Sequence, residues 1–251
     1  MSGHSKWSTI KHKKGALDAK RGKIFSKLGK EIAVAARTGG DPETNPRLRQ
    51  VLQKAKAANM PTDNVKRAIQ RGTGEIPGMV YEEIVYEGFA PSGVALLVEL
   101  TTDNKNRTAS EIRSVFTKGG GHIGGPGSVK HLFHRKGHII IAKDKANEDE
   151  LLTIALDAGA DDMQSVNDTY EIVTALDHFD AVTKALEKHN IKPESAALEF
   201  MPTLTVPIAD EDSAQKILRL IESLEDHDDV QNVYANFDIP DEILSKAAAA
   251  A

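Results

Sequence analysis

Apolar residues recur at helical spacing through the first 72 residues of the chain. Residues 16–37 predict one helix, because four apolar side chains share a face at 100° per residue: Ile24, Leu28, Ile32 and Ala35. A second helix is predicted from 46 to about 58, since Asn45 followed by Pro46 is a favoured helix start. A third follows Pro61 and stops at Gly72. Three short, linked helices predict a small bundle.

The first predicted helix also has a charged face. Its lysines are spaced by three, four and three residues, which places them in one row along the helix: Lys20, Lys23, Lys27 and Lys30. We therefore expect this helix to pack on one side and to present a row of ammonium groups on the other.

The pattern changes to α/β after residues 72–79, GTGEIPGM, which we interpret as a linker. Strands are predicted at 80–86, 94–101 and 128–133, with a helix at 106–118 and a glycine-rich loop, GGGHIGGPG, at 119–127. Residues 137–200 follow the ferredoxin-like order of strand, helix, strand, strand, helix and strand. A strand at 204–208, a helix at 213–224 and a strand at 230–236 complete the half unit of 80–133.

These elements predict an α+β protein of three domains, with an N-terminal helical bundle followed by two α/β ferredoxin-like domains, one inserted in the other. The expected domains are 1–75 for the bundle, 79–134 plus 203–240 for the discontinuous middle domain, and 135–202 for the insertion.

Charge is divided unevenly along the chain. The total is -5, but residues 1–71 hold 17 Lys and Arg against 5 Asp and Glu, a net of +12. The cations of such a segment repel one another unless a polyanion is near. Nucleic acid is such a polyanion, and its binding is favoured by the release of counterions from the phosphates. A solvated basic surface, or a contact with the chain's own acidic part, is the alternative. The candidate nucleic-acid-binding residues of residues 1–71 are Lys6, Trp7, Lys11, Lys13, Lys14, Lys20, Arg21, Lys23, Lys27, Lys30, Arg47, Arg49, Lys66, Arg67 and Arg71, and Lys54 and Lys56 extend the same track.

Two candidates carry an alternative interpretation. Trp7 lies in a polar segment, residues 1–15, that we expect to be a mobile arm, and it either packs on the helices or stacks on a base. Arg107 either contacts a phosphate or belongs to the start of a helix that Asp103 or Asn106 caps, and we favour capping.

Several kinds of chemistry are not expected. The chain has no cysteine, which excludes disulfides, Cys-ligated metals and thiol nucleophiles and suits a cytoplasmic protein. The sequence contains no stretch of 18 apolar residues, so we expect no membrane span. The glycine-rich loop follows a helix and leads to a strand, the reverse of a P-loop. His122, His131, His134 and His138 are expected to be partly exposed rather than metal ligands, and Asp161, Asp162, Asp228 and Asp229 to be solvated charges. We expect no enzyme activity, no cofactor and no small-molecule substrate.

Four segments together resemble the YebC/PmpR family of probable transcriptional regulatory proteins. They are GHSKWSTIKHKKGALDAKRGKIFSKLGKEI at the N-terminus, NMPTDNVKRAIQRG at 59–72, YEGFAPSGVALLVE at 86–99 and TDNKNRTASEIRSVFTKGGG at 102–121. The resemblance covers essentially the whole chain. It implies a cytoplasmic protein of three domains that binds DNA and regulates transcription. The family usually has a small residue and a tryptophan where Lys130 and His131 stand, which changes a predicted strand face.

The resemblance supports two functions, because mitochondrial relatives are translational activators and some bacterial members are linked to the ribosome. A DNA-binding transcriptional regulator is the first hypothesis, and a translation factor associated with RNA or the ribosome is the second. A protein-interaction scaffold is the third. A lysine ammonium binds the phosphates of DNA and RNA in the same way, so the sequence does not distinguish the two. The sequence also leaves the oligomeric state open.

Overall fold

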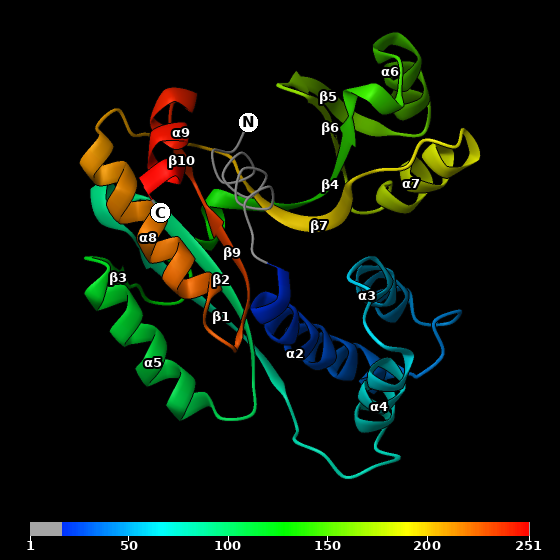
Figure 1. Cartoon of the computed structure of the whole chain (residues 1–251), viewed down its shortest axis with the longest axis horizontal. Coiled ribbons are helices and arrows are strands. Elements are labelled where there is room, and N and C mark those ends of the chain that lie inside the picture. The colour runs from blue at the N-terminus through cyan, green and yellow to red at the C-terminus, as the bar shows by residue number, and fades with distance from the viewer. Residues whose placement is uncertain (1–16, 251) are drawn as a thin grey trace. The chain divides into compact units, whose positions relative to one another are not determined.

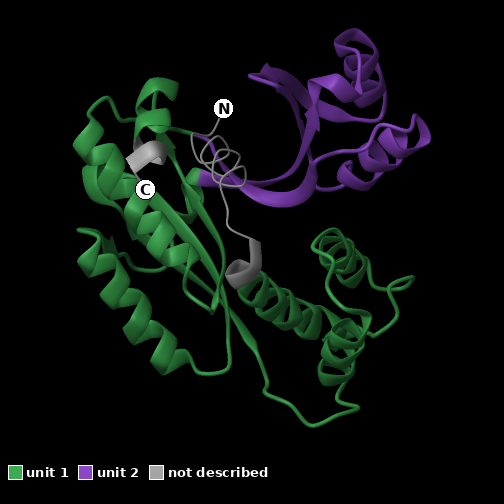
Figure 2. Cartoon of the chain, viewed as in Figure 1, with its two compact units in different colours: residues 1–132, 204–251 green, residues 133–203 purple. Residues whose placement is uncertain are grey.

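The computed structural model describes the backbone of residues 17–250 and the side chains of residues 21–246. It divides into two compact units, which Figure 2 colours separately. The first unit comprises residues 1–132 and 204–251, and the second comprises residues 133–203. Helices and antiparallel sheets are both present, with a helical region at the N-terminal end (Figure 1), so the α+β prediction is confirmed. Among the described residues, no helix combines the length and the apolar character needed to cross a membrane.

The N-terminal bundle of the first unit consists of α2 (Leu17–Ala35), α3 (Pro46–Ala57) and α4 (Thr62–Thr73), as predicted. Its core is formed by buried side chains from all three helices, among them Leu28, Ile32, Leu48, Val51 and Ala68. Ile24 is an exception to the prediction, because 45% of it is exposed and it lies outside this core.

Asn45 fixes the start of α3 and ties it to α2. Its side-chain oxygen accepts a hydrogen bond from Leu48 N at 3.1 Å, and its amide donates to Ala35 O at 2.8 Å and to Gly39 O at 2.7 Å. Gly72 permits α4 to approach α2, since a Cβ there would lie 2.3 Å from Ala33 O. The bundle therefore depends on a cap residue and a glycine as much as on apolar periodicity.

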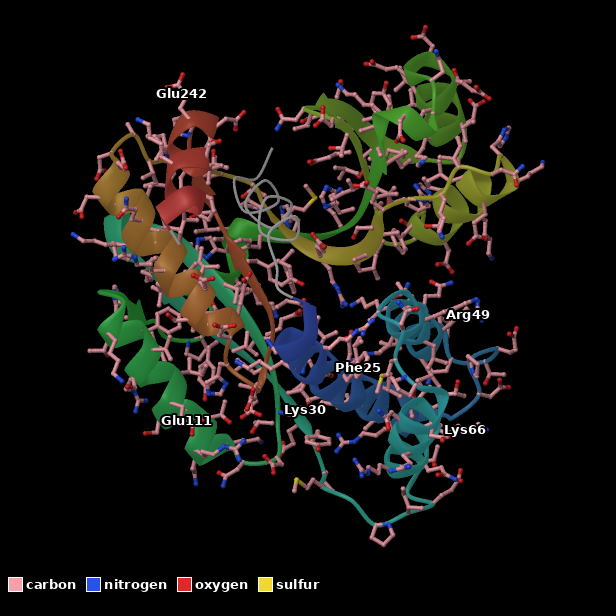
Figure 3. All side chains as sticks on the ribbon, in the orientation of Figure 1. Phe25, Lys30, Arg49, Lys66, Glu111 and Glu242 are labelled. Carbon is pink, nitrogen blue, oxygen red and sulfur yellow. The ribbon has the colours of Figure 1, made fainter. Side chains whose placement is uncertain are left out.

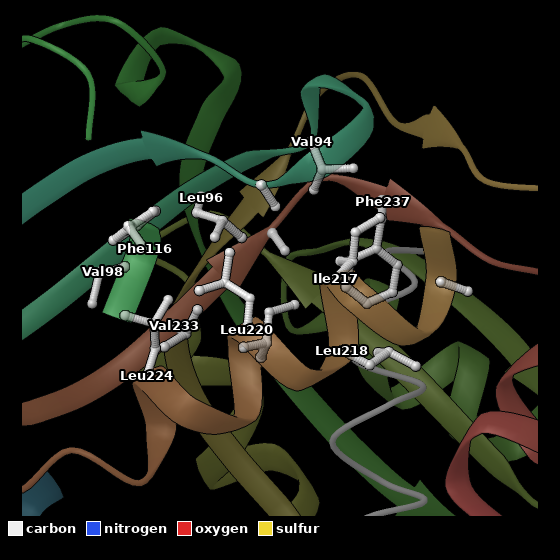
Figure 4. Close-up of a cluster of buried hydrophobic side chains, with 14 of the residues drawn as sticks. Val94, Leu96, Val98, Phe116, Ile217, Leu218, Leu220, Leu224, Val233 and Phe237 are labelled. Atoms are coloured by element: carbon white, nitrogen blue, oxygen red, sulfur yellow. The ribbon is translucent and has the colours of Figure 1, made fainter. Parts of the chain in front are cut away.

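The rest of the first unit is an antiparallel sheet covered by two helices, and we call it the central part. Its sheet has the order β3-β1-β2-β9, and helices α5 and α8 contribute the facing core. The bounds are β1 (Glu82–Phe89), β2 (Ala95–Thr102), α5 (Lys105–Lys118), β3 (His122–Ile123), α8 (Glu211–Glu225) and β9 (Val230–Ala235). Figure 4 shows Leu96, Val98 and Val233 of the sheet meeting Leu220 and Leu224 of α8.

Residues 203–250 close the central part. A short parallel pair joins β8 (Val206–Pro207) to β10 (Phe237–Asp238), and α9 (Asp241–Ala250) follows. The pattern had not predicted α9, which inserts buried Leu244 into the core of the central part.

The strand predicted at 128–133 is wrong. Residues Lys130–Leu132 form a 3-10 turn instead, and the next strand begins at Phe133. The cause is Glu87, a buried carboxylate that accepts hydrogen bonds from Gly127 N, Val129 N and Lys130 N at 2.7–2.8 Å. Burial would raise the pKa of the Glu87 carboxyl, but these three donors outweigh it and lower the pKa.

The same turn places Lys130 and His131 on the surface. Both are exposed, while Val129 beside them is fully buried. The charged pair therefore lies outside the core, in a turn and not on the strand face predicted from the sequence.

The second unit has the predicted ferredoxin-like order. Its sheet order is β5-β6-β4-β7, with every neighbouring pair antiparallel. The elements are β4 (Phe133–Ala142), α6 (Glu148–Asp157), β5 (Ala160–Val166), β6 (Thr169–Thr174), α7 (Phe179–Lys188) and β7 (Ser195–Pro202). Its core combines Ile139, Ile141 and Ile172 from the sheet with Leu151 and Val182 from the helices.

His138 of β4 is not the partly exposed histidine that we expected. Only 3% of it is exposed, and its Nε2 and Nδ1 lie 3.2 Å from Glu171 Oε2 and 3.4 Å from Glu199 Oε2. Burial lowers the pKa of the imidazole, but the two glutamates raise it further, to about 9. The folded second unit therefore holds a cationic histidine at neutral pH.

Candidate nucleic-acid interface

Three lysines of the predicted row on α2 are held by the chain itself, and the side chain of the fourth, Lys20, lies outside the described residues. Lys23 Nζ donates to Asp226 O at 3.2 Å, Lys27 Nζ to Glu225 O at 2.6 Å, and Lys30 Nζ to Asp228 O at 3.0 Å. All three acceptors lie at the C-terminal end of α8 or in the turn that follows it. The ammonium groups that periodicity placed on one face are therefore bound by another part of the first unit.

The end of α8 explains why lysines gather there. The last carbonyls of a helix have no partner inside it and form the negative pole of the helix dipole, where cations are favoured. The last turn of α8 contains no basic residue, so it provides no cation of its own. Burial lowers the pKa of Lys27, and the neighbouring Glu225 and Asp226 oppose that effect.

Asp229 anchors this contact and is not the solvated charge that we expected. It is 2% exposed, and its carboxylate lies 2.6 Å from Lys30 Nζ, 2.7 Å from an Nη of Arg107 and 2.7 Å from the Thr108 hydroxyl. Burial would raise the pKa of Asp229, but hydrogen bonds from Lys30, Arg107 and Thr108 lower it well below its usual range. Asp229 is therefore an anion at all physiological pH values.

Arg107 is held by acidic side chains of its own chain. Besides Asp229, it reaches Asp103 Oδ1 at 3.0 Å. Its backbone N–H donates at 3.1 Å to the side chain of Asn104, which is the N-cap of α5 in place of the predicted Asp103 or Asn106. Arg107 thus connects the start of α5 to the α8–β9 turn.

An open cleft of about 710 Å³ lies beside this contact, lined by Lys23, Lys30, Met79, Tyr81, Asp103, Arg107, Glu111, Asp226, His227, Asp228 and Asp229. Glu111, His227 and Asp229 each bring a potential metal-ligand atom within 4.8 Å of the others. His227 already accepts from Asp229 N at 3.1 Å and contacts Glu111 Oε2 at 3.0 Å. Both oxygens of Asp229 are also occupied, so the cluster is an internal polar network rather than an open ligand set.

The predicted cations on α3 divide into bound and free ones. Arg47 makes a two-pronged ion pair with Glu83, with 3.1 Å between one nitrogen and Oε2. Arg49 donates to Pro42 O at 3.0 Å and to Glu43 O at 2.8 Å. Lys54 pairs with Glu31, whereas Lys56 is exposed.

The cations of α4 are the most open of the candidate set. Lys66, Arg67 and Arg71 are all exposed, and within the described residues none of the three makes an ion pair. Figure 3 labels Lys66 on α4, together with Arg49 on α3 and Lys30 on α2. Arg67 and Arg71 are four residues apart, so they share one helix face. A ligand can therefore reach these three groups without first breaking an ion pair among the described residues.

The remaining predicted site residues lie in the N-terminal segment or at the start of α2. Lys6, Trp7, Lys11, Lys13 and Lys14 lie outside the described residues. Lys20 falls within α2, and Arg21, one residue on, has an exposed side chain.

A contact with the chain's own acidic part was one alternative expected from the sequence, but the acidic segment itself was not identified. Residues 222–229 read ESLEDHDD, with five acids and no lysine or arginine. That composition at a helix end is electrostatically unfavourable on its own, and this was the signal that a cationic partner would cover it.

Comparison with known proteins identifies relatives along nearly the whole chain. Residues 5–75 match the model of the TACO1/YebC protein N-terminal domain, and residues 81–237 match that of the TACO1/YebC second and third domain. A probable transcriptional regulatory protein of Syntrophobacter fumaroxidans is 56% identical over 99% of this chain and 100% of its own length. A protein of the same name from Acidobacterium capsulatum is 56% identical over 95% of this chain and 97% of its own.

A solved structure has the same fold. The crystal structure of a conserved hypothetical protein from Aquifex aeolicus superposes with a TM-score of 0.85 at 50% identity, covering 94% of this chain and 97% of that one. Matches to both domain models, and relatives of this identity over nearly full length, leave one assignment: the chain belongs to the TACO1/YebC family.

Proposed function

We propose that this protein regulates transcription by binding DNA through its N-terminal helical bundle. The observation that carries the proposal is the concentration of charge, a net of +12 in residues 1–71, with exposed and unpaired cations on α4. The names of its relatives, probable transcriptional regulatory proteins, agree with this role. We assign it no catalytic step and no cofactor.

The proposed contact is electrostatic and does not read sequence. Lys66, Arg67 and Arg71 approach phosphates directly, because no ion pair has to be broken first. Each phosphate neutralised releases counterions, so the logarithm of the affinity falls with the logarithm of salt by about 0.9 per contact. Arg47 and Arg49 lie on the neighbouring helix and extend the track once their present acceptors are exchanged for phosphates.

Charge reversal on α4 tests the proposal. Lys66→Glu, Arg67→Glu and Arg71→Glu together should weaken binding of a fluorescent 30-base-pair duplex by about tenfold or more at moderate salt, and flatten the salt dependence. The matched control is Lys184→Glu, Lys188→Glu and Lys192→Glu, three exposed lysines of the second unit. Equal loss in both triple variants, or no loss in either, rejects the bundle as the DNA-binding surface.

A translation role on RNA predicts a different preferred ligand in the same assay. If a structured RNA hairpin binds much more tightly than the duplex, and the α4 variant loses the hairpin, the polyanion is RNA. Cosedimentation of the full chain with ribosomes then distinguishes free RNA from the ribosome as the partner.

A further inference from the structure

We propose that the contact between α2 and the end of α8 is an autoinhibitory latch, which must open before the lysine row can hold a nucleic acid. The latch consists of Lys23, Lys27 and Lys30 on one side and residues 225–229 on the other. This inference rests on the proposed function, since it concerns how the same bundle becomes available to a polyanion.

The latch is a polar contact and not a shared core. The buried apolar cluster of the bundle and that of the central part have no residue in common. Charged groups join the two: the lysine row on the α8 end, Lys30 on Asp229, and Arg47 on Glu83. Lys30 also lies 5.9 Å from the ring centre of Tyr81. Salt weakens the exposed contacts of Lys23 and Arg47 most, and it screens the buried Lys30–Asp229 pair much less.

The acceptors of the latch compete with phosphate for the same ammonium groups. Lys27 is half-buried, and Lys30 keeps only 16% of its side chain exposed. A phosphate oxygen cannot approach either nitrogen along the direction that a carbonyl already occupies. The five acids of residues 222–229 would also lie beside any phosphate that reached the row and repel it. The closed latch therefore disfavours a polyanion on Lys27 and Lys30.

The connection between the bundle and the central part is suited to opening. Residues 74–81 contain no regular secondary structure. Met79 and Val80 within them are 64% and 70% exposed, so these apolar side chains do not anchor the linker. A tether of this kind lets the bundle separate without unfolding either core.

Closing the latch lowers the apparent affinity of the lysine row in proportion to the fraction of molecules that are closed. The cations of α4 are not part of the latch, so they are available for a first encounter. Initial contact through α4, followed by release of α2, would add the phosphate contacts of Lys23, Lys27 and Lys30 in a second step.

Removing the latch carboxylate that pairs with Lys30 tests this directly. Asp229→Asn deletes the buried charge that holds Lys30 and keeps the side chain's shape. Asp212→Asn is the matched control, because it removes the same charge from the exposed first turn of α8. Asp229→Asn should bind the duplex about fivefold more tightly or better, within the usual range of coupling factors, and Asp212→Asn less than about twofold. Equal affinities of the two variants overturn the latch while leaving DNA binding by the bundle intact.

A distance measurement on the otherwise unchanged chain covers the case in which Asp229→Asn fails to fold. The protein has no cysteine, so Gln53→Cys on α3 and Ser114→Cys on α5, both exposed, provide two unique spin-label sites. The distance distribution between the labels should shift when saturating duplex is added, and also when NaCl is raised without duplex. An unchanged distribution with duplex bound overturns the latch alone. Failure of the duplex to bind at any salt overturns the proposed function with it, and the NaCl response then shows whether the contact opens at all.

Discussion

The second unit should lose stability as pH rises through about 9, and His138 is the group responsible. Its imidazole is 3% exposed and lies between Glu171 and Glu199, which hold its pKa at about 9 against an ordinary value of 6.5. A raised pKa means that the folded state binds the proton more tightly than the unfolded state does. The contribution to stability is therefore complete below about pH 6.5 and is lost as pH rises through 9.

The size of the effect follows from the shift. A difference of about 2.5 units corresponds to a ceiling of about 3.4 kcal/mol, at 1.36 kcal/mol per unit. Glu199 keeps 35% of its side chain exposed, so water screens part of its attraction for the imidazole. We therefore expect about 1–2 kcal/mol to be lost between pH 7 and pH 9.5.

Hydrogen exchange on the full chain measures this loss locally. Amides of β4 and β6 report opening of the second unit, and their opening free energies, corrected for the intrinsic pH dependence of exchange, should fall by the amount above. In His138→Gln the fall should vanish, because glutamine does not titrate. His131→Gln, at an exposed histidine outside the second unit, is the control and should behave as the parent does.

A direct titration provides the refuting result. The ring carbon signal that disappears in His138→Gln identifies His138, and it should titrate above pH 8. A midpoint below pH 7 would mean that burial outweighs the two glutamates, and the stability argument would fail with it.

Three other substitutions should act by separate mechanisms. Glu87→Gln should destabilise the 121–130 loop by about 1–3 kcal/mol, seen as faster exchange of its amides, because the N–H groups of Gly127 and Val129 lose an ionised acceptor. In the parent, protection of these amides relative to their intrinsic exchange rate should also fall as pH falls through the lowered pKa of Glu87. Gly137→Ala should lower the melting temperature sharply, since a Cβ would lie 2.4 Å from Phe179, whereas Gly125→Ala meets nothing within 4 Å and should be neutral. Asn45→Ala should destabilise the bundle by about 1–2 kcal/mol in urea unfolding, because its side chain caps α3 and holds it to α2. A loss of stability no larger than that of an alanine substitution at an exposed position would contradict this role.

The parts of the fold that periodicity predicted are those whose partners are close in sequence. Helices α3 and α4 begin where Asn45 and Pro61 indicate, although α4 continues past Gly72 to Thr73. The ferredoxin-like order of 137–200 is readable from alternating runs. The strand at 128–133 was mispredicted because its backbone donors go to Glu87, about 40 residues earlier. Apolar content in 128–133 resembles that of a strand, and no local pattern reveals a distant buried carboxylate.

The candidate site was predictable in composition but not in geometry. Helical spacing correctly places Lys23, Lys27 and Lys30 on one side of α2, yet spacing alone does not say whether that side meets solvent or another helix end. Burial of Asp229 and His138 was missed for a related reason. Both are charged residues kept inside by partners from other elements, and such partners emerge only when the strands are paired.

The basic N-terminal segment and the acidic remainder of the chain contact each other. The basic N-terminal segment was interpreted as a nucleic-acid-binding part, with a contact to the chain's own acidic part as an alternative, and the two parts do meet at the end of α8. The acids that balance the total are therefore not only a solubilising surface. The backbone carbonyls of residues 225, 226 and 228 and the carboxylate of Asp229 accept hydrogen bonds from Lys23, Lys27 and Lys30. Under the latch proposal, these contacts limit nonspecific binding by a segment with a net charge of +12. Under the latch proposal, the chain discriminates against weak polyanions, because only a polyanion that offers many phosphates at once can replace the acceptors of Lys23, Lys27 and Lys30.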